Sequence, residues 1–285
     1  MKKTMVWTMS LLLALSLTAC SGNDTKTTEA DTTAAETTAS TTEAEPTTTE
    51  PASTSSTGAA EEETLSAEEL SEFREAVEKY NALSAKEEHL QMTQNIGEGA
   101  EVQKVELDAT VKQIGEGETA QIEFTGTQTN NGTKTEILLH YKDGVAYLAT
   151  GGQKVQVASN FASVQQMIGG EYISGVEKIA YSALNREVQA DGSVKLTLTI
   201  SAKEQGVDSG VVEVVIGADG QILSLHAQQE GTITSGTTSM KTTIEMTVEI
   251  QNTDDAVKIN YPDFSDYLDA SAGSETTAAE TTAAN

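Results

Sequence analysis

The sequence has few of the residues that build cross-links, metal centres or catalytic sites. Its single cysteine, Cys20, excludes an internal disulfide and any site that needs several thiolates, so a packed core must stabilise the fold. The three histidines lie far apart in the sequence, and strand alternation places His140 and His226 on the solvated face of their strands. No nucleophile elbow, zinc-protease motif, phosphate loop or EF-hand loop is present. We therefore expect no enzyme, no metal site and no cofactor.

Basic residues and tryptophan are also scarce. The chain has 17 Lys and Arg against 44 Asp and Glu, a formal net charge of −27 at pH 7. Nucleic acid and anionic lipid headgroups both bind basic faces, so neither is expected as a direct partner. The one tryptophan, Trp7, lies in the N-terminal segment described next, which leaves no indole in the remaining chain to stack on sugar rings.

The N-terminal segment has the pattern of an export signal. Lys2 and Lys3 precede an apolar run over residues 5–17, which is too short for a comfortable membrane span, and Ala19 stands just before Cys20. A lone cysteine at this point is typical of a bacterial lipoprotein signal, in which the thiol receives diacylglycerol and becomes the mature N-terminus. Two acyl chains, palmitate for example, suffice for durable anchoring. We expect a protein attached by a lipid on Cys20 to the extracytoplasmic face of the cell membrane.

Composition divides the rest of the chain into three parts. Residues 20–60, after the signal peptide of residues 1–19, are rich in Thr, Glu, Ala and Ser with almost no aliphatic side chains, which predicts a disordered tether behind the lipidated cysteine. Residues 275–285 nearly repeat the tether sequence of residues 31–40, and residues 270–285 are predicted to be a disordered tail. Residues 61–269 lie between these segments and are long enough to bury a full core as one domain.

The domain opens with a predicted helix. Ser66 and Glu69 have the spacing of a capping box, and Leu65 and Leu70 stand where a hydrophobic staple is found. The positions that follow repeat at helical spacing and give one apolar stripe, formed by Leu70, Phe73, Val77 and Tyr80.

After this helix, apolar and polar residues alternate along most of the domain. The clearest case is residues 240–250, where Met, Thr, Ile, Met, Val and Ile face one way and Lys, Thr, Glu, Thr and Glu the other. Asn131-Gly132, Asp143-Gly144, Asp191-Gly192 and Asp219-Gly220 provide the positive φ angles that tight hairpins need. The pattern predicts a mainly β, α+β fold in which about ten to twelve antiparallel strands form a long meander.

Such a sheet leaves a large apolar face to cover. Apart from the opening helix, only residues 161–179 offer a second helical apolar segment. A strongly twisted meander can curl and partly close over its own face. We therefore expect a half-barrel with a short helical plug, whose interior either is packed solid or holds a cavity.

The chain resembles bacterial envelope lipoproteins with a LolA-like or LppX-like half-barrel, including lipid and lipoglycan carriers of Gram-positive envelopes. The resemblance rests on the lipidation signal, the tether, the short helix and a hairpin over residues 138–148, LLHYKDGVAYL, followed by GGQKV at 151–155. It extends to VVIGADGQIL at 214–223 and VKINYP at 257–262. The resemblance implies a concave face on which helices enclose acyl chains, although some members of the group show no ligand.

Two functions remain open. The first is a non-enzymatic lipoprotein that binds or carries an apolar ligand, such as a lipid or a lipid-linked glycan. The residues expected to bind that ligand are the apolar ones that face the plug, namely Leu90, Met92, Ile137, Leu139, Phe161, Met167, Ile168, Tyr172 and Met246. The second is an interaction module with a packed core, in which an exposed strand edge or polar face binds an envelope protein.

Overall fold

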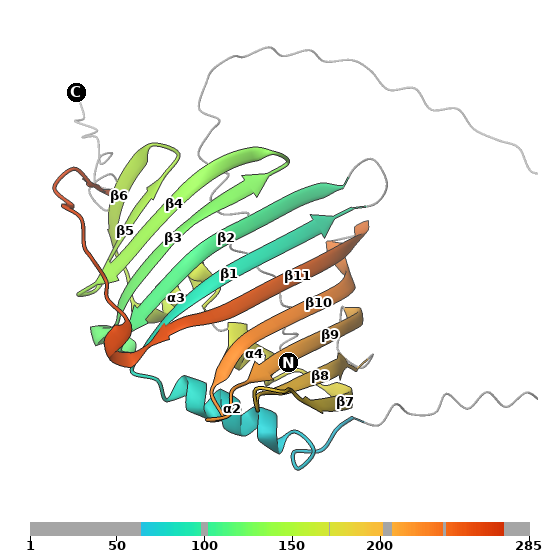
Figure 1. Ribbon diagram of the computed structural model, residues 1–285. Helices are drawn as coiled ribbons and strands as arrows, with labels where there is room; N and C mark the ends of the chain where they lie inside the picture. The colour runs from blue at the N-terminus through green and yellow to red at the C-terminus, as the bar shows by residue number, and fades with distance from the viewer. Residues whose placement is uncertain (1–63, 98–101, 171, 202–206, 236–237, 271–285) are drawn as a thin grey trace, which may run out of the picture. The chain divides into compact units, whose positions relative to one another are not determined.

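The computed structural model describes residues 64–97, 102–170, 172–201, 207–235 and 238–270. The predicted signal peptide, the lipidation site at Cys20 and nearly all of the predicted tether and tail lie outside the described residues. The described chain is mostly β, and its strands form one open, curled sheet of twelve strands with a few short helices (Figure 1). This confirms the predicted half-barrel.

The sheet is built from two groups of strands. The first group follows helix α2 (Ser71–Asn81) and consists of β1 (Ala85–Ile96), β2 (Gln103–Ile114), β3 (Gln121–Asn130), β4 (Thr133–Lys142), β5 (Val145–Thr150) and β6 (Gln153–Ala158), with the short 3-10 helix η2 (Gly117–Thr119) before β3. Helices α3 (Phe161–Ile168) and α4 (Tyr172–Val176) come next. The second group is β7 (Tyr181–Val188), β8 (Val194–Ile200), β9 (Val207–Ile216), β10 (Ile222–Ser235) and β11 (Thr238–Thr253), followed by η3 (Asp254–Ala256) and the two-residue β12 (Leu268–Asp269).

The strand order shows that the meander is interrupted once. The order across the sheet is β12-β6-β5-β4-β3-β2-β1-β11-β10-β9-β8-β7, so the last long strand, β11, pairs with the first strand, β1. The chain therefore leaves the sheet after β6, near one edge, and re-enters it at β7, the opposite edge. Helices α3 and α4 form this crossover and lie behind the sheet in Figure 1. The predicted helical plug is the segment that makes the crossing.

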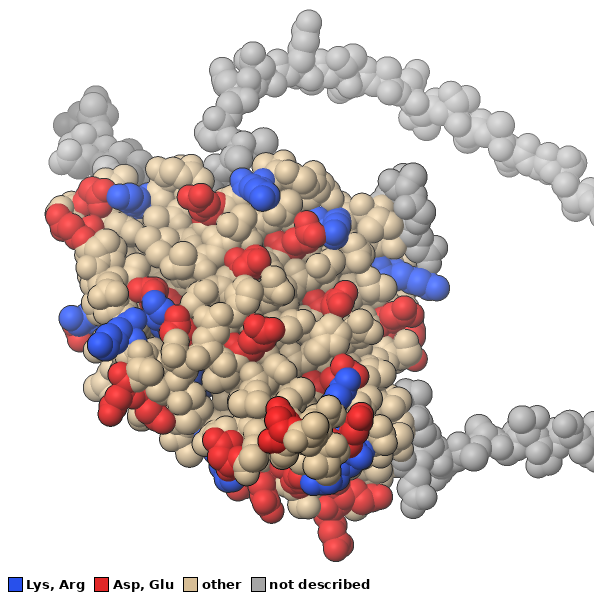
Figure 2. All heavy atoms as spheres, in the orientation of Figure 1, with Lys and Arg blue, Asp and Glu red and all other residues tan. Residues whose placement is uncertain are grey.

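Alternation sorts the side chains onto two faces. The inner face carries Leu90 and the other buried apolar side chains of β1–β4 and β8–β11, and the helices of the crossover lie on it. The outer face carries the intervening polar residues. In Figure 2, acidic and basic side chains are interspersed over the face turned to the viewer. The turns have the expected geometry, since Asn131 and Gly132 have φ angles of 47° and 85°, and Asp143 and Gly144 have 53° and 78°.

Helix α2 lies along one end of the half-barrel in Figure 1. The predicted capping box forms in the turn before the helix, where the Ser66 backbone N–H donates to Glu69 Oε2 at 2.8 Å and the Glu69 N–H donates to Ser66 Oγ at 3.3 Å. These hydrogen bonds hold the pKa of Glu69 below its usual range. The apolar stripe is buried as predicted, with Phe73 and Val77 at 1% and 0% exposure.

The C-terminal segment between η3 and β12 covers part of the outer face. Phe264 stacks on Tyr147 with ring centroids 3.8 Å apart, and Tyr261 and Phe264 lie 5.6 and 5.5 Å from the His140 ring. His140 is therefore on the predicted face, but the expectation that it is solvated is wrong, since it is only 2% exposed. This burial lowers the pKa of His140, although the Glu123 carboxylate, 3.5 Å from Nε2, favours the charged form.

Two small residues, Ala109 and Gly126, lie side by side in one row of partners across the inner face. Leu90, Ala109, Gly126 and Ile137 are consecutive partners across β1–β4. A Cβ atom placed on Gly126 would lie 2.6 Å from Ala109 Cβ and 2.8 Å from the carbonyl oxygen of Asp108. The backbone of β2 thus approaches Gly126 too closely for any side chain.

We expect Gly126→Ala to lower the free energy of unfolding by about 1–3 kcal/mol, because the added methyl group overpacks this row. Urea unfolding followed by far-UV circular dichroism measures the change. The matched variant is Gly126→Ala with Ala109→Gly, which moves the methyl group to the other strand and should recover part of the loss. A double variant no more stable than the single one would show that the contact with Ala109 is not the cause.

Candidate functional site

The candidate site is the inner face beneath α3 and α4. Residues from strands far apart in the sequence meet on it, because β11 lies directly beside β1. Met92 is the direct partner of Met246 on β11 and of Leu107 on β2, and Leu90 is the partner of Val248. On the other side of the same face, Ile137 and Leu139 of β4 pair with Gly126 and Phe124 of β3. The result is a continuous apolar surface.

The structure brings the predicted ligand-binding residues to this covered face and buries most of them. The strand members Leu90, Met92, Ile137, Leu139 and Met246 are between 0% and 7% exposed, and Ile168 and Tyr172 of the crossover are 3% and 4% exposed. Phe161 and Met167, both on α3, are half-buried. Their role in binding a ligand stays a prediction.

The helices of the crossover are short and sharply bounded. The Asn160 side chain caps α3 by accepting a hydrogen bond from the Ser163 backbone N–H at 2.8 Å. Gly169 ends the helix with a φ angle of 70°, a left-handed conformation that glycine adopts without strain. In the turn that follows, the Tyr172 hydroxyl donates to the Ile168 carbonyl oxygen, and burial raises the pKa of Tyr172 well above its usual range.

Polar contacts beneath the helices join them to the inner face of the sheet. On α3, Gln165 Nε2 donates to Gln113 Oε1 of β2 at 2.7 Å, and Gln113 Nε2 donates in turn to the Gly115 carbonyl oxygen at 3.0 Å. On α2, the Tyr80 hydroxyl donates to Oε1 of Glu88 on β1. The Glu88 side chain is buried, which raises the pKa of its carboxyl group even though Lys86 and the Tyr80 hydroxyl favour the charged form.

On the inner face and the helices that cover it, three polar atoms are buried without a hydrogen-bond partner among the described residues. They are the hydroxyl groups of Tyr141 and Thr242 and the Oε1 atom of Gln165. Tyr141 belongs to β4 and Thr242 to β11, on the same face as Leu139 and Met246. Gln165 belongs to α3, which together with α4 forms the helical cover of this face. An unsatisfied buried polar group costs about 1–3 kcal/mol, so each of these atoms favours a polar group or a water molecule beside it.

The alternation predicts the apolar members of this site but the sequence analysis missed the polar ones. Glu88 stands two and four residues before Leu90 and Met92, so its position in the pattern indicated the inner face. Gln113 stands two residues after Val111, at the end of the apolar series of β2. In each case a polar residue occupies a position of the apolar alternation, and that was the available signal.

The titratable side chains do not form a metal-binding cluster within the described part of the chain. No group of three or more His, Cys, Asp or Glu residues there is arranged to hold a metal ion. His89 Nε2 lies 2.9 Å from Asp108, His226 Nδ1 lies 3.0 Å from Thr247, and His140 is beneath the C-terminal aromatic residues. The described part of the chain also contains no helix that is long and apolar enough to cross a membrane.

Comparisons with known proteins add little. No family model matches the chain, and no curated protein matches it. Among solved structures, LprF from Mycobacterium bovis matches at 13% identity with a TM-score of 0.38, over 70% of this chain and 99% of that one. The ywiB protein from Bacillus subtilis matches at 9% identity with a TM-score of 0.22, over 61% and 99%. These scores are too low to support any statement on function, so the half-barrel rests on the strand order itself.

The burial of Glu88 gives a testable pH dependence. A carboxyl group whose pKa is raised by folding contributes stability at low pH, and that contribution is lost as the pH rises through the raised value. Glutamine does not titrate, so Glu88→Gln should be more stable than the wild type above that value, by about 1–2 kcal/mol, and the difference should shrink toward pH 4. Urea unfolding at pH 4, 6 and 8 measures it.

The control is Glu87→Gln, one residue away on the outer face, where Glu87 accepts a hydrogen bond from Asn252 at 2.7 Å. This variant should show no gain that grows with pH. An equal pH dependence in both variants, or a loss of stability in Glu88→Gln at every pH, would contradict the assignment to the buried carboxyl group.

Proposed function

We propose that the protein is a lipoprotein anchored through Cys20 to the extracytoplasmic face of the cell membrane, and that its inner face binds or carries an apolar ligand. A lipid or a lipid-linked glycan is the class of ligand that fits, since both combine long apolar chains with a few polar groups. The proposal has no catalytic step. The protein's task is to hold an apolar molecule away from water.

One observation carries this proposal: a continuous apolar face under a separate helical cover contains buried polar atoms without partners. A core that serves only stability gains nothing from the unpaired hydroxyl groups of Tyr141 and Thr242. A bound amphiphile supplies partners for such groups, together with apolar chains to contact Met92 and Met246. Methionine side chains suit this role because they adapt to ligands of irregular shape.

The cover has the properties that ligand entry needs. Its helices, α3 and α4, are eight and five residues long and are separated by Gly169 and Gly170. Only two side chains of α3, Val164 and Ile168, are fully buried. Few side chains of α3 itself therefore hold it to the sheet, and the polar contact that its movement breaks is the one between Gln165 and Gln113.

A second candidate function is favoured by the edge strand β7. It is the last strand of the sheet, and its residues 185–188 are exposed, with Val188 at 61%. The Leu65 N–H donates to the Tyr181 carbonyl oxygen at 2.7 Å, which covers only the start of this edge. An extended segment of an envelope protein could pair with the rest, and the core would then be purely structural.

The anchor is tested by substituting the cysteine. Cys20→Ser should move the protein from the membrane fraction to the soluble fraction, because the serine hydroxyl does not receive the diacylglycerol that anchors the chain. Cell fractionation and intact-mass spectrometry measure the loss of the lipid. The neighbouring substitution Ser21→Ala should leave both results unchanged. Membrane retention of Cys20→Ser with an unaltered mass would contradict lipidation at this residue.

The ligand is tested by native mass spectrometry with lipid extraction on the chain from residue 20, carrying Cys20→Ser and exposed to host membranes. We expect a stoichiometric lipid adduct. Phe161→Ala combined with Met167→Ala should reduce the adduct several-fold without unfolding the protein, because both side chains are half-buried on the cover.

The control is Leu223→Ala, which removes a side chain that is 45% exposed. It should retain the wild-type adduct. A clean ligand-free mass after membrane exposure, or a double variant that binds as much lipid as the wild type, would favour the interaction module.

A further inference from the structure

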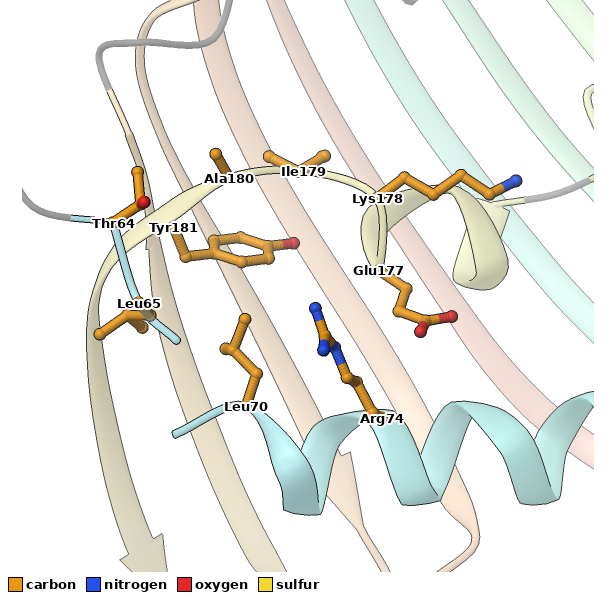
Figure 3. A pocket seen from close by; sticks show the side chains of 9 residues that line it. All are labelled: Thr64, Leu65, Leu70, Arg74, Glu177, Lys178, Ile179, Ala180 and Tyr181. Atoms are coloured by element: carbon orange, nitrogen blue, oxygen red, sulfur yellow. The ribbon is translucent and has the colours of Figure 1, made fainter. Parts of the chain in front are cut away.

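A pocket of about 460 Å³ lies outside the inner face, between the start of α2 and the segment that joins α4 to β7. Figure 3 shows its lining, with Leu70 and Arg74 on the helix and Glu177 to Tyr181 opposite them. The Leu65 backbone N–H closes one side by its hydrogen bond to the Tyr181 carbonyl oxygen. None of the predicted ligand-binding residues lines this pocket, and its volume is in the range of small-molecule sites.

The pocket contains a guanidinium group whose Nε atom has no partner among the described residues. The chain has only two arginines, and they differ sharply in their surroundings. Arg186 on β7 forms a bidentate ion pair with Glu72 of α2, in which Nε lies 2.6 Å from Oε2 and Nη2 lies 3.0 Å from Oε1. Within the described residues, Arg74 has no ion pair, and its Nε atom is buried without a hydrogen-bond partner.

A shortage of acidic groups does not explain this. Helix α2 carries Glu78 four residues after Arg74, a spacing at which oppositely charged helical residues pair. The Arg74 side chain instead rises from the helix into the pocket, between Tyr181 and Glu177 (Figure 3). A buried guanidinium N–H that forgoes available carboxylates is expected to have a partner that binds in the pocket.

The remaining walls define the chemistry of that partner. Leu65, Leu70 and Tyr181 provide apolar surface beside Arg74. Lys178 lines the pocket with its side chain turned away from Arg74 (Figure 3), and Glu177 adds one carboxylate that accepts hydrogen bonds from hydroxyl groups. The lining therefore suits a molecule that combines an anionic group for Arg74, hydroxyl groups for Glu177 and an apolar portion.

We propose that this pocket binds the glycerophosphate headgroup of a lipid, with the phosphate on Arg74, the glycerol hydroxyls near Glu177 and the first part of the acyl chains along Leu65 and Leu70. The planar guanidinium matches two phosphate oxygens at once. The net charge of −27 still opposes non-specific attraction of anionic membranes, because that effect depends on the summed field. The guanidinium group of Arg74 acts at short range within the pocket, which is a separate matter, and this site does not depend on the inner face.

The two arginines make a direct experiment possible. In the ¹⁵N-labelled chain from residue 20 with Cys20→Ser, the arginine Nε–Hε region of an NMR spectrum contains two signals, one for Arg74 and one for Arg186. Titration with dihexanoyl phosphatidylglycerol should shift the Arg74 signal in a saturable manner and leave the Arg186 signal unchanged. Glycerol 3-phosphate should bind at least about tenfold more weakly, because it lacks the apolar portion. Dihexanoyl phosphatidylcholine should be weaker by at least the same factor, because its headgroup lacks the hydroxyl groups and the net charge.

Isothermal titration calorimetry on variants completes the test. Arg74→Gln should weaken phosphatidylglycerol binding at least about tenfold, whereas the matched substitution Arg186→Gln should not. The wild-type titration needs no variant, so a folding defect in Arg74→Gln leaves the test intact. An Arg74 signal that does not move, equal shifts of both signals, or glycerol 3-phosphate binding as tightly as the lipid would overturn the proposal. A lipid adduct in mass spectrometry with an unshifted Arg74 signal would assign that lipid to the inner face alone.

Discussion

The chain must pass from β6 to β7, strands near opposite edges of the sheet, and the arrangement of the half-barrel depends on this crossing. Adjacent strands are about 4.8 Å apart, so a flat sheet in this order would place β6 and β7 roughly 48 Å apart. Curling shortens the path, and the helices of the crossover fill the space that curling creates. The same segment therefore connects the two strand groups and covers the apolar face. Small residues at Ala109 and Gly126 permit the close strand approach that the curl requires.

The helices are fixed to this sheet by a few polar contacts between apolar surfaces. Apolar packing is not directional, and on its own it allows a short helix to slide along the face. The contact of Gln165 with Gln113 fixes α3, and the contact of Tyr80 with Glu88 and the exposed ion pair of Glu72 with Arg186 fix α2. The first two contacts place polar atoms beneath the helices, at a cost in desolvation that an apolar pair would avoid. In return, these contacts specify one position of the helices on the sheet. Such a defined position is most important for a cover that opens and closes, because the helices must return to the same place.

Local sequence patterns predicted much of the fold because they report local geometry. Alternation gave the strands, positive-φ turns such as Asn131-Gly132 gave the hairpins, and the capping box gave the start of the first helix. The pairing of β11 with β1 is a contact between distant segments, and no local pattern contains it. The error on His140 has the same origin, since alternation tells which face a side chain occupies but not which segment later covers that face. Arg74 was missed because the lack of a partner for its Nε atom is visible only in three dimensions.

The two proposed sites differ in the force that would hold a ligand. Contacts on the inner face depend on the burial of apolar surface, which contributes about 25 cal/mol per Å² and depends little on moderate salt. The contact with Arg74 depends on charge, and salt weakens it. Because the chain as a whole is strongly acidic, its long-range field repels an anionic lipid, and attraction begins only once the headgroup lies within the pocket. A ligand on the inner face would therefore bind with little salt dependence, whereas binding in the Arg74 pocket would respond to salt in two opposite ways. Screening would reduce the approach barrier and would also weaken the final contact.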